Sequence, residues 1–363
     1  MKVPFIELCR EWDFFEEEFI KAFKLFGQNA VYALGSDVEN FEANFAKYCG
    51  YRYSVGVSTG LAALEVILRA YDVKSGDEVI TVGNSAVATS LAISSVGAKP
   101  VFCDVNENFL IDVEQIESLI TSKTKAILPV HLFGGVCDMR PINELAKKYK
   151  IFVIEDACQA HGCKFINESA VNSKAFSFYP TKNLGAFGEG GIIVTNEEVV
   201  RDFSLKYRNY GQNGRYNHEI KGTNYRIDPL QCALLNVKLD SLNKAVERRK
   251  EIAKKYIESL GHLEQIKINN YNSSSSFHLF VIRVLNGERD NLRDHLKKNE
   301  VDSLVHYPVT IYKQPCYKDE YDNVVLVNTD KFQEEILSLP CYPFLKEDEQ
   351  DFVIKQVKGF FSL

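Results

Sequence analysis

Short apolar runs alternate with amphipathic segments along the first part of the chain. Seven runs of five or six residues are predicted as strands: Tyr53–Val57, Glu78–Val82, Pro100–Val105, Ala126–Val130, Ile151–Glu155, Ala175–Tyr179 and Gly191–Thr195. Apolar residues at helical spacing between them predict helices at Leu61–Ala70, Val113–Ile120 and Ile142–Lys148. Continuous apolar strands that alternate with helices are typical of a mainly parallel sheet covered on both faces. The pattern therefore predicts an α/β fold around a large, mostly parallel seven-stranded sheet.

The two ends of the chain follow a different pattern. Residues 1–50 are predicted to be mainly helical, and apolar residues from Leu239 to Leu260 recur at the spacing of one long amphipathic helix. Beyond it, predicted strands at Phe277–Leu285 and Ser303–Tyr307 with flanking helices form a smaller α+β unit. We expect a large domain over 1–236, with an N-terminal helical segment, and a small C-terminal domain over 237–363.

Composition and charge exclude several classes of protein. The chain has 363 residues, 45% of them hydrophobic and 25% charged, which is ordinary for a globular protein. Its net charge of -6 does not favour a nucleic-acid partner. The charged N-terminus and the lack of a long apolar run predict neither a signal peptide nor a membrane span. Nine scattered cysteines without zinc-site spacing are typical of reduced thiols in a cytoplasmic protein with no metal.

Lys182 lies in a stretch that indicates chemistry. It follows an apolar strand and Pro180, and four glycines come after it between residues 185 and 191. Glycines let the backbone approach a ligand closely, and a buried lysine can lose its charge and form an imine with a carbonyl cofactor. The alternative is an ordinary loop lysine beside glycines that only turn the chain.

Polar or glycine-rich turns also follow the other predicted strands, at the edge where open α/β sheets bind ligands. Ser58-Thr59-Gly60 opens into a helix whose free N–H groups attract phosphate, although the same turn also caps ordinary helices. Asp156 is either a helix cap or the partner of a cationic ligand group. His131 follows another strand, and a lone histidine there is more often structural than catalytic.

A phosphate site, a carboxylate and a lysine on successive strand ends are what pyridoxal 5'-phosphate requires. Asp156 would keep the pyridine nitrogen protonated, and Lys182 would carry the substrate proton. A nicotinamide enzyme would need Gly-x-Gly-x-x-Gly after an early strand, whereas Val55–Gly60 has two glycines at the wrong spacing.

Three motifs carry a resemblance to a known family: Asp156–Gly162, Phe176–Gly185 and Gly222–Gln231. In this order they resemble the DegT/StrS-type sugar-nucleotide aminotransferases, which are fold type I pyridoxal phosphate enzymes. The resemblance runs from Val3 to Pro308. It implies a fold type I aminotransferase that acts on a nucleotide-linked keto sugar with glutamate as amino donor.

The resemblance also implies individual roles. Lys182 would form the imine with the cofactor, Asp156 would pair with the pyridine nitrogen, and Gln159 would lie near the ring hydroxyl. The phosphate would be held by Gly60, Leu61 and Ser177, with Asn224 reaching it from the partner subunit of a homodimer whose active site lies at the interface. His306 and Tyr307 match a segment near the sugar-nucleotide site.

Within the family, the Gly60-Leu61 pair and the run Arg208–Gly211 resemble enzymes that aminate C3 of a dTDP-linked 3-keto-6-deoxyhexose. A 4-keto sugar-nucleotide aminotransferase and a non-catalytic cofactor-binding regulatory protein are alternatives. A sugar dehydratase of this fold has histidine in place of the lysine, so Lys182 argues against it.

Two positions depart from the family pattern. Ala86 stands where relatives carry an aromatic residue that stacks on the cofactor ring, and a methyl group cannot supply that stacking area. Tyr312 stands where relatives often have histidine, so substrate contacts from this loop are not implied.

Overall fold

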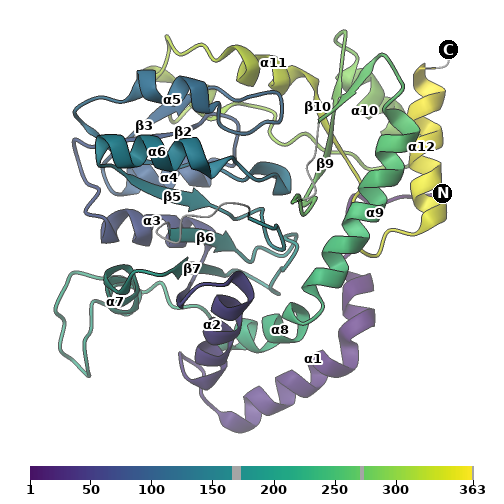
Figure 1. Cartoon of the computed structure of the whole chain (residues 1–363). Helices are drawn as coiled ribbons and strands as arrows, with labels where there is room; N and C mark the ends of the chain where they lie inside the picture. The colour runs from purple at the N-terminus through teal and green to yellow at the C-terminus, as the bar shows by residue number, and fades with distance from the viewer. Residues whose placement is uncertain (166–172, 270–273, 362–363) are drawn as a thin grey trace.

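The computed structural model describes residues 1–165, 173–269 and 274–361, and these build two β-sheets (Figure 1). The larger sheet has seven strands in the order β1-β7-β6-β5-β4-β2-β3. Strand β7 is antiparallel to both neighbours, and the remaining neighbours are parallel. The strands are β1 (Tyr53–Val57), β2 (Glu78–Val82), β3 (Lys99–Cys103), β4 (Thr124–Ile127), β5 (Phe152–Asp156), β6 (Ser173–Ser177) and β7 (Gly191–Thr195). The predicted mostly parallel seven-stranded sheet is confirmed.

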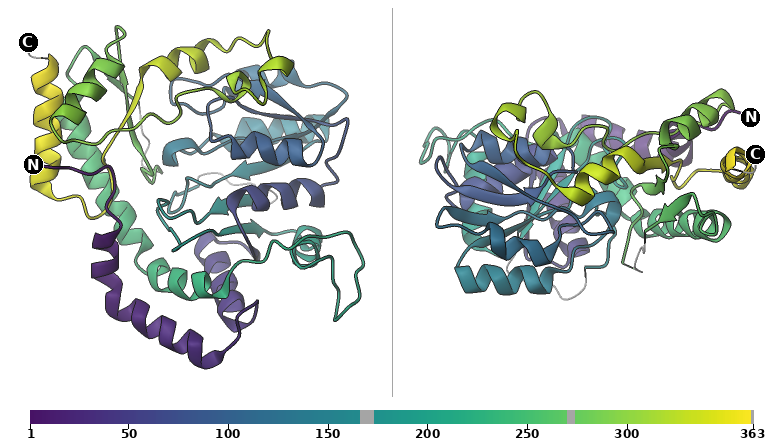
Figure 2. Two further views of the ribbon diagram at one scale, coloured as in Figure 1. Left: turned by 180° about the vertical axis from the view of Figure 1, so that it is seen from behind. Right: turned by 90° about the horizontal axis from the view of Figure 1, so that it is seen from above.

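Helices cover both faces of this sheet, because alternate residues of a strand point to opposite sides. Ala175 and Ile193 face a core that includes α3, whereas Phe176 and Ile192 face a core built with α2 and α8. Figures 1 and 2 show the sheet between these layers. The helices of this part are α1 (Cys9–Asn29), α2 (Ser36–Cys49), α3 (Gly60–Ala70), α4 (Ala88–Ser95), α5 (Val113–Leu119), α6 (Met139–Tyr149), α7 (Glu198–Tyr207) and α8 (Pro229–Leu239).

A smaller antiparallel sheet has the order β10-β9-β8 and a core of its own. Val3, near the N-terminus, pairs with Val301 and is buried in this second core. The elements that follow α9 are β8 (Ile266–Ile268), β9 (Phe280–Val284), β10 (Ile336–Leu339), α10 (Arg289–Lys298), α11 (Val327–Glu335) and α12 (Glu347–Phe361). Of the 3₁₀ turns in the described residues, η1 (Leu132–Gly134) follows β4 of the large sheet, whereas η2 (Ile311–Lys313) and η3 (Lys318–Glu320) precede α11. A second α+β unit is therefore present.

One element prediction was wrong, and another was confirmed with a shifted start. The expected strand Ser303–Tyr307 is an irregular segment with a single bridge between Leu304 and Ser338. The expected long amphipathic helix is confirmed as α9 (Leu242–Leu260), although it begins three residues later than expected, because α8 ends at Leu239 and Asp240 and Ser241 separate the two helices. Short polar side chains favour such helix ends because they compete for backbone hydrogen bonds.

Helix α9 runs from the large sheet toward the small one (Figure 1). The expected division between residues 236 and 237 falls in the last turn of α8, just before this connection. We propose that the chain divides there into its large and small domains. None of the helices in the described ranges is long and apolar enough to cross a membrane.

Candidate active site

The candidate phosphate residues lie together at the carboxyl end of the large sheet. Gly60 begins α3 directly after β1, and a Cβ atom added to it would lie 2.7 Å from Ser177 Cβ and 2.8 Å from Cys158 Sγ. A side chain at this position would collide with both residues, so only glycine permits this close packing. Thr59 caps the helix by accepting a hydrogen bond from the Ala62 N–H at 3.0 Å. The amino end of α3, including Leu61, therefore lies close to Ser177 and Cys158, and its dipole favours an anion there.

Asp156 ends β5 and is 5% exposed. Its Oδ2 accepts a hydrogen bond from Thr89 Oγ1 at 2.8 Å, and its Oδ1 accepts one from the Cys158 N–H at 3.1 Å. Ser85 Oγ in turn donates to Thr89 Oγ1 at 3.1 Å. The residues that follow Asp156 form turns, so the helix-cap alternative does not apply. A buried carboxylate held by donors is suited to pairing with a cationic ligand group.

Lys182 lies on the loop after β6, where its backbone N–H donates to the Tyr179 carbonyl at 2.8 Å. Burial lowers the pKa of Lys182 below its ordinary value, and the nearby Cys158 and Asp156 oppose this effect without cancelling it. A lysine with a lowered pKa holds more of the neutral, nucleophilic amine. The alternative of an ordinary solvated loop lysine does not fit this environment.

Gln159 connects this site to the C-terminal part of the chain. Its Nε2 donates to Tyr307 Oη at 3.1 Å, and its Oε1 accepts from the Phe133 N–H at 2.7 Å. Burial raises the pKa of Tyr307 to about 12. The neighbouring His306 contacts Ser338 Oγ through Nδ1 at 2.9 Å, and burial and the charge of Lys182 lower its pKa to about 4. His306 and Tyr307 thus lie beside the Lys182 site, although the sequence separates them widely from it.

Asn224 is exposed in the segment that follows α7. It forms an isolated bridge with Asn209, and the carbonyl of the next residue, Tyr225, accepts a hydrogen bond from the Ser58 N–H at 2.9 Å. This segment therefore lies along the end of β1, beside the start of α3. The exposed side chain is available to a second chain.

His131 is structural, as the sequence favoured. Its Nε2 lies 2.8 Å from Glu155 Oε2, and its Nδ1 accepts a hydrogen bond from the Cys137 N–H at 3.1 Å. Glu155 also forms a buried ion pair with Lys174 of β6. Burial opposes the charge of Glu155, but Lys174 and His131 outweigh it and lower its pKa to about 2. His131, Glu155 and Lys174 together link the segments of β4, β5 and β6 next to the strand end that carries Asp156.

Tyr312 is also structural. It is 1% exposed and its Oη donates to Asp330. A Cβ atom added at Gly83 would lie 2.6 Å from the Tyr312 ring, so the glycine of the loop after β2 makes room for this tyrosine. Tyr312, which stands where relatives often have histidine, is therefore used for packing within the chain.

The chain matches the family model described as the DegT/DnrJ/EryC1/StrS aminotransferase family over residues 14–358. It belongs to this aminotransferase family. It is 39% identical over 366 residues to dTDP-3-amino-3,6-dideoxy-alpha-D-galactopyranose transaminase from Aneurinibacillus thermoaerophilus, covering 99% of each chain. It is 37% identical over 364 residues to dTDP-3-amino-3,4,6-trideoxy-alpha-D-glucose transaminase from Streptomyces venezuelae, covering 98% of this chain and 96% of that one.

Solved structures agree with the fold type I assignment. Bacillus subtilis NtdA, solved with its bound cofactor PMP, superimposes on this aminotransferase with a TM-score of 0.94 and 31% identity, covering 100% of this chain and 86% of that one. The cofactor of this aminotransferase is pyridoxal 5'-phosphate. The amino end of α3 at Gly60, the buried Asp156 carboxylate and the lowered pKa of Lys182 fit the phosphate, pyridine nitrogen and aldehyde of that cofactor.

Sequence reasoning missed Thr89 and Ser85. Both lie where α4 meets the loop after β2, and α4 itself was not predicted because its small residues show little amphipathic pattern. The available signal was the short polar pair Ser85 and Thr89 around the Ala86 position. Nothing in the sequence showed that Thr89 Oγ1 points at Asp156.

We predict that Thr89→Val lowers kcat of the aminotransferase about tenfold, because it removes a hydrogen bond to a buried carboxylate while keeping the side-chain shape. Thr89→Ser keeps the hydroxyl and should retain most activity. The two variants should be compared by kcat and by the pH dependence of the cofactor absorbance. An unchanged absorbance profile in Thr89→Val would show that the hydroxyl only supports packing.

Proposed function

We propose that this enzyme transfers an amino group from glutamate to C3 of a dTDP-linked 3-keto-6-deoxyhexose. The observation that carries the proposal is Lys182, a half-buried lysine of lowered pKa near the Asp156 carboxylate, in a chain whose relatives are named as dTDP-3-amino sugar transaminases. The Gly60-Leu61 start of α3 supports amination at C3 rather than C4.

Each site residue has a proposed role. Lys182 bonds to the cofactor in the resting enzyme and carries the proton between carbons, and Asp156 pairs with the pyridine nitrogen. Gln159 lies at the ring hydroxyl, and the cradle formed by Gly60, Leu61 and Ser177 holds the phosphate. When bound, pyridoxal phosphate supplies the electron sink that makes loss of the α-proton possible. His306 and Tyr307 contact the sugar-nucleotide from the second α+β unit.

We further propose a homodimer with its active sites at the interface, in which Asn224 reaches the phosphate held by the other chain. The exposure of Asn224 supports this proposal. So do large apolar side chains exposed on the second half of α1 and just after it: Phe23, Leu25 and Tyr32 are 59%, 51% and 65% exposed. Exposed apolar groups of this size are typical of surfaces that contact another chain.

The test is a panel of 3-keto and 4-keto sugars linked to dTDP, UDP and GDP, each incubated with the purified enzyme and glutamate. Product mass and the position of the new nitrogen are the measurements. We expect a 3-amino sugar from the dTDP-linked 3-keto substrates. A 4-amino product would contradict the C3 assignment. A protein that binds the cofactor but aminates no member of the panel, and fails to convert the cofactor with glutamate, would support the regulatory alternative.

A further inference from the structure

Helix α11 begins without a cap from its own sequence. Its N-cap residue is Leu326, whose side chain accepts no hydrogen bond, so the free N–H groups of the first turn need acceptors from elsewhere. Asp104, directly after β3 of the large sheet, supplies them. Its Oδ2 accepts from the Asn328 N–H at 2.9 Å, and its Oδ1 accepts from the N–H and from Oγ1 of Thr329, both at 2.8 Å. A carboxylate 224 residues earlier in the chain therefore caps this helix.

The end of β3 and the start of α11 are bonded in both directions. Asp104 is 4% exposed, and its Oδ1 also accepts from the Val105 N–H at 2.8 Å. Asn328 Nδ2 donates to the Val105 carbonyl at 2.7 Å. The dipole of α11 favours a negative charge at its amino end, which is where the Asp104 carboxylate lies. Figures 1 and 2 show α11 beside the β3 edge of the large sheet. The start of α11 is thereby fixed to that sheet.

Helix α11 and the strand that follows it hold the segment that carries His306 and Tyr307. Gln333, on the last turns of α11, accepts a hydrogen bond from the Thr310 N–H through its Oε1 at 3.0 Å. Ser338, on β10 directly after α11, contacts His306 Nδ1 through its Oγ at 2.9 Å. The position of this segment therefore depends on where α11 lies.

We propose that Asp104 is a positioning residue of this aminotransferase: by capping α11 it holds His306 and Tyr307 at the Lys182 site. The inference rests on the proposed function, which gives these two residues contacts with the sugar-nucleotide. Tyr307 is joined to the site by its hydrogen bond from Gln159. Asp104 acts through the helix and not on the reacting atoms, so its loss should change how the substrate is held more than how fast it reacts.

The first experiment compares Asp104→Asn with Asp112→Asn by hydrogen exchange of the cofactor-loaded enzyme. Asp112 is the matched control, because it caps its own helix, α5, by accepting from the Glu114 N–H at 3.2 Å. Asparagine removes the charge and has a single amide oxygen, so its NH₂ group faces a donor of α11. We expect the backbone amides of residues 304–312 to exchange about tenfold faster in Asp104→Asn, as loss of a helix cap predicts, and at the wild-type rate in Asp112→Asn.

Steady-state kinetics then separates positioning from a loss of general stability. Asp104→Asn should raise KM for the sugar-nucleotide about tenfold, with kcat and cofactor content unchanged, whereas Asp112→Asn should match the wild type. Thr329→Val keeps the carboxylate and removes one of its hydrogen bonds, so it should show the same pattern at about threefold. This milder variant decides the question if Asp104→Asn folds poorly.

Three outcomes overturn the proposal. They are wild-type exchange of residues 304–312 in Asp104→Asn and Thr329→Val, an equal change in Asp112→Asn, and faster exchange with unchanged KM, since the cap would then serve folding alone. The exchange measurement also keeps this inference separate from the proposed function. If the wild type aminates no sugar of the panel, the proposed function fails, and faster exchange confined to Asp104→Asn and Thr329→Val still supports the anchoring of this segment by Asp104.

Discussion

Replacement of Lys182 by alanine is expected to abolish transamination. The amine at this position both bonds to the cofactor and moves the substrate proton, and loss of general acid–base catalysis alone costs about 10²–10⁴-fold. In the wild type, borohydride should attach the cofactor covalently to the peptide that contains Lys182, as peptide mass would show. Glutamate should convert the cofactor absorbance in the wild type and leave it unchanged in Lys182→Ala.

Lys147→Ala is the matched control, because Lys147 is exposed on α6, a helix outside the site. It should behave as the wild type in both measurements. Turnover by Lys182→Ala within tenfold of the wild type would contradict the assignment of this lysine.

The same variant also tests the proposed dimer. If Asn224 acts across the interface, mixing Lys182→Ala chains with Asn224→Ala chains creates heterodimers with one intact site, containing Lys182 of one chain and Asn224 of the other. Activity should then exceed that of either variant alone. No rescue after exchange of subunits, with heterodimers demonstrated by mass, would show that Asn224 acts within its own chain.

Asp156→Asn is expected to give the second largest effect, a loss of about 10²–10³ in kcat. Asparagine keeps the shape, and its single amide oxygen can still accept from the Cys158 N–H while its NH₂ group faces Thr89 Oγ1, but it lacks the negative charge that favours a protonated pyridine nitrogen. The half-reaction with glutamate, followed by cofactor absorbance, measures this loss directly. Cofactor content and thermal midpoint should be measured alongside, because they separate a chemical defect from unfolding.

A loss smaller than threefold in Asp156→Asn, with full cofactor content, would contradict the pairing of Asp156 with the pyridine nitrogen. Thr89→Val should then also leave kcat unchanged, because the Thr89 hydroxyl acts through the Asp156 carboxylate. The two variants together therefore distinguish an electrostatic role of Asp156 from a packing role.

The strands were the best predicted part of the fold. The bounds of β1, β2 and β7 were exact, and β6 begins and ends two residues earlier than expected. These strands are buried on both faces, so each is an uninterrupted apolar run that can be recognised locally. The errors fell where pattern is weak: the segment 303–307 has one bridge in place of a strand, and two polar residues divide α8 from α9.

The sequence by itself determined which strand ends carry chemistry. Lys182, Asp156 and Gly60 each follow an apolar strand directly, and the carboxyl ends of parallel strands meet at one edge of a sheet. That argument, with the family motifs, was sufficient for the cofactor and the aminotransferase activity.

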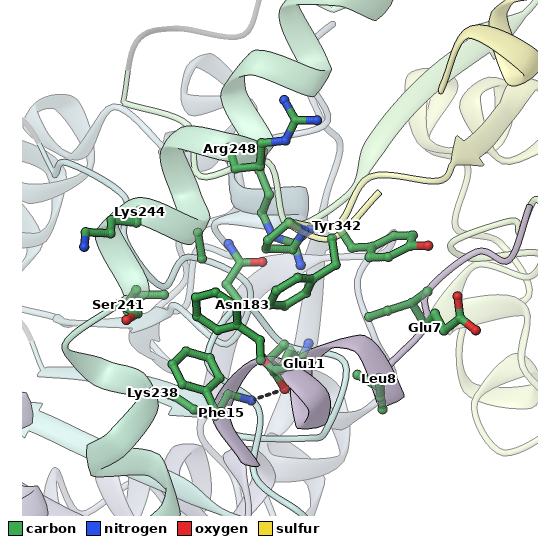
Figure 3. Close-up of a pocket in the computed structure, with 18 of the residues that line it drawn as sticks. Glu7, Leu8, Glu11, Phe15, Asn183, Lys238, Ser241, Lys244, Arg248 and Tyr342 are labelled. Carbon is green, nitrogen blue, oxygen red and sulfur yellow. Dashed lines mark hydrogen bonds and ion pairs between the residues drawn. The ribbon is translucent and has the colours of Figure 1, made fainter. Parts of the chain in front are cut away.

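Only the tertiary structure decided what surrounds these residues. The bond from Thr89 to Asp156, the bond from Gln159 to Tyr307 and the packing of Tyr312 against Gly83 each join segments far apart in the chain. So does the pocket beside Lys182 in which α1, α9 and residues 342–344 meet (Figure 3). Local periodicity encodes each element and its buried face, whereas the meeting of two side chains depends on strand order and helix direction, which no local pattern contains.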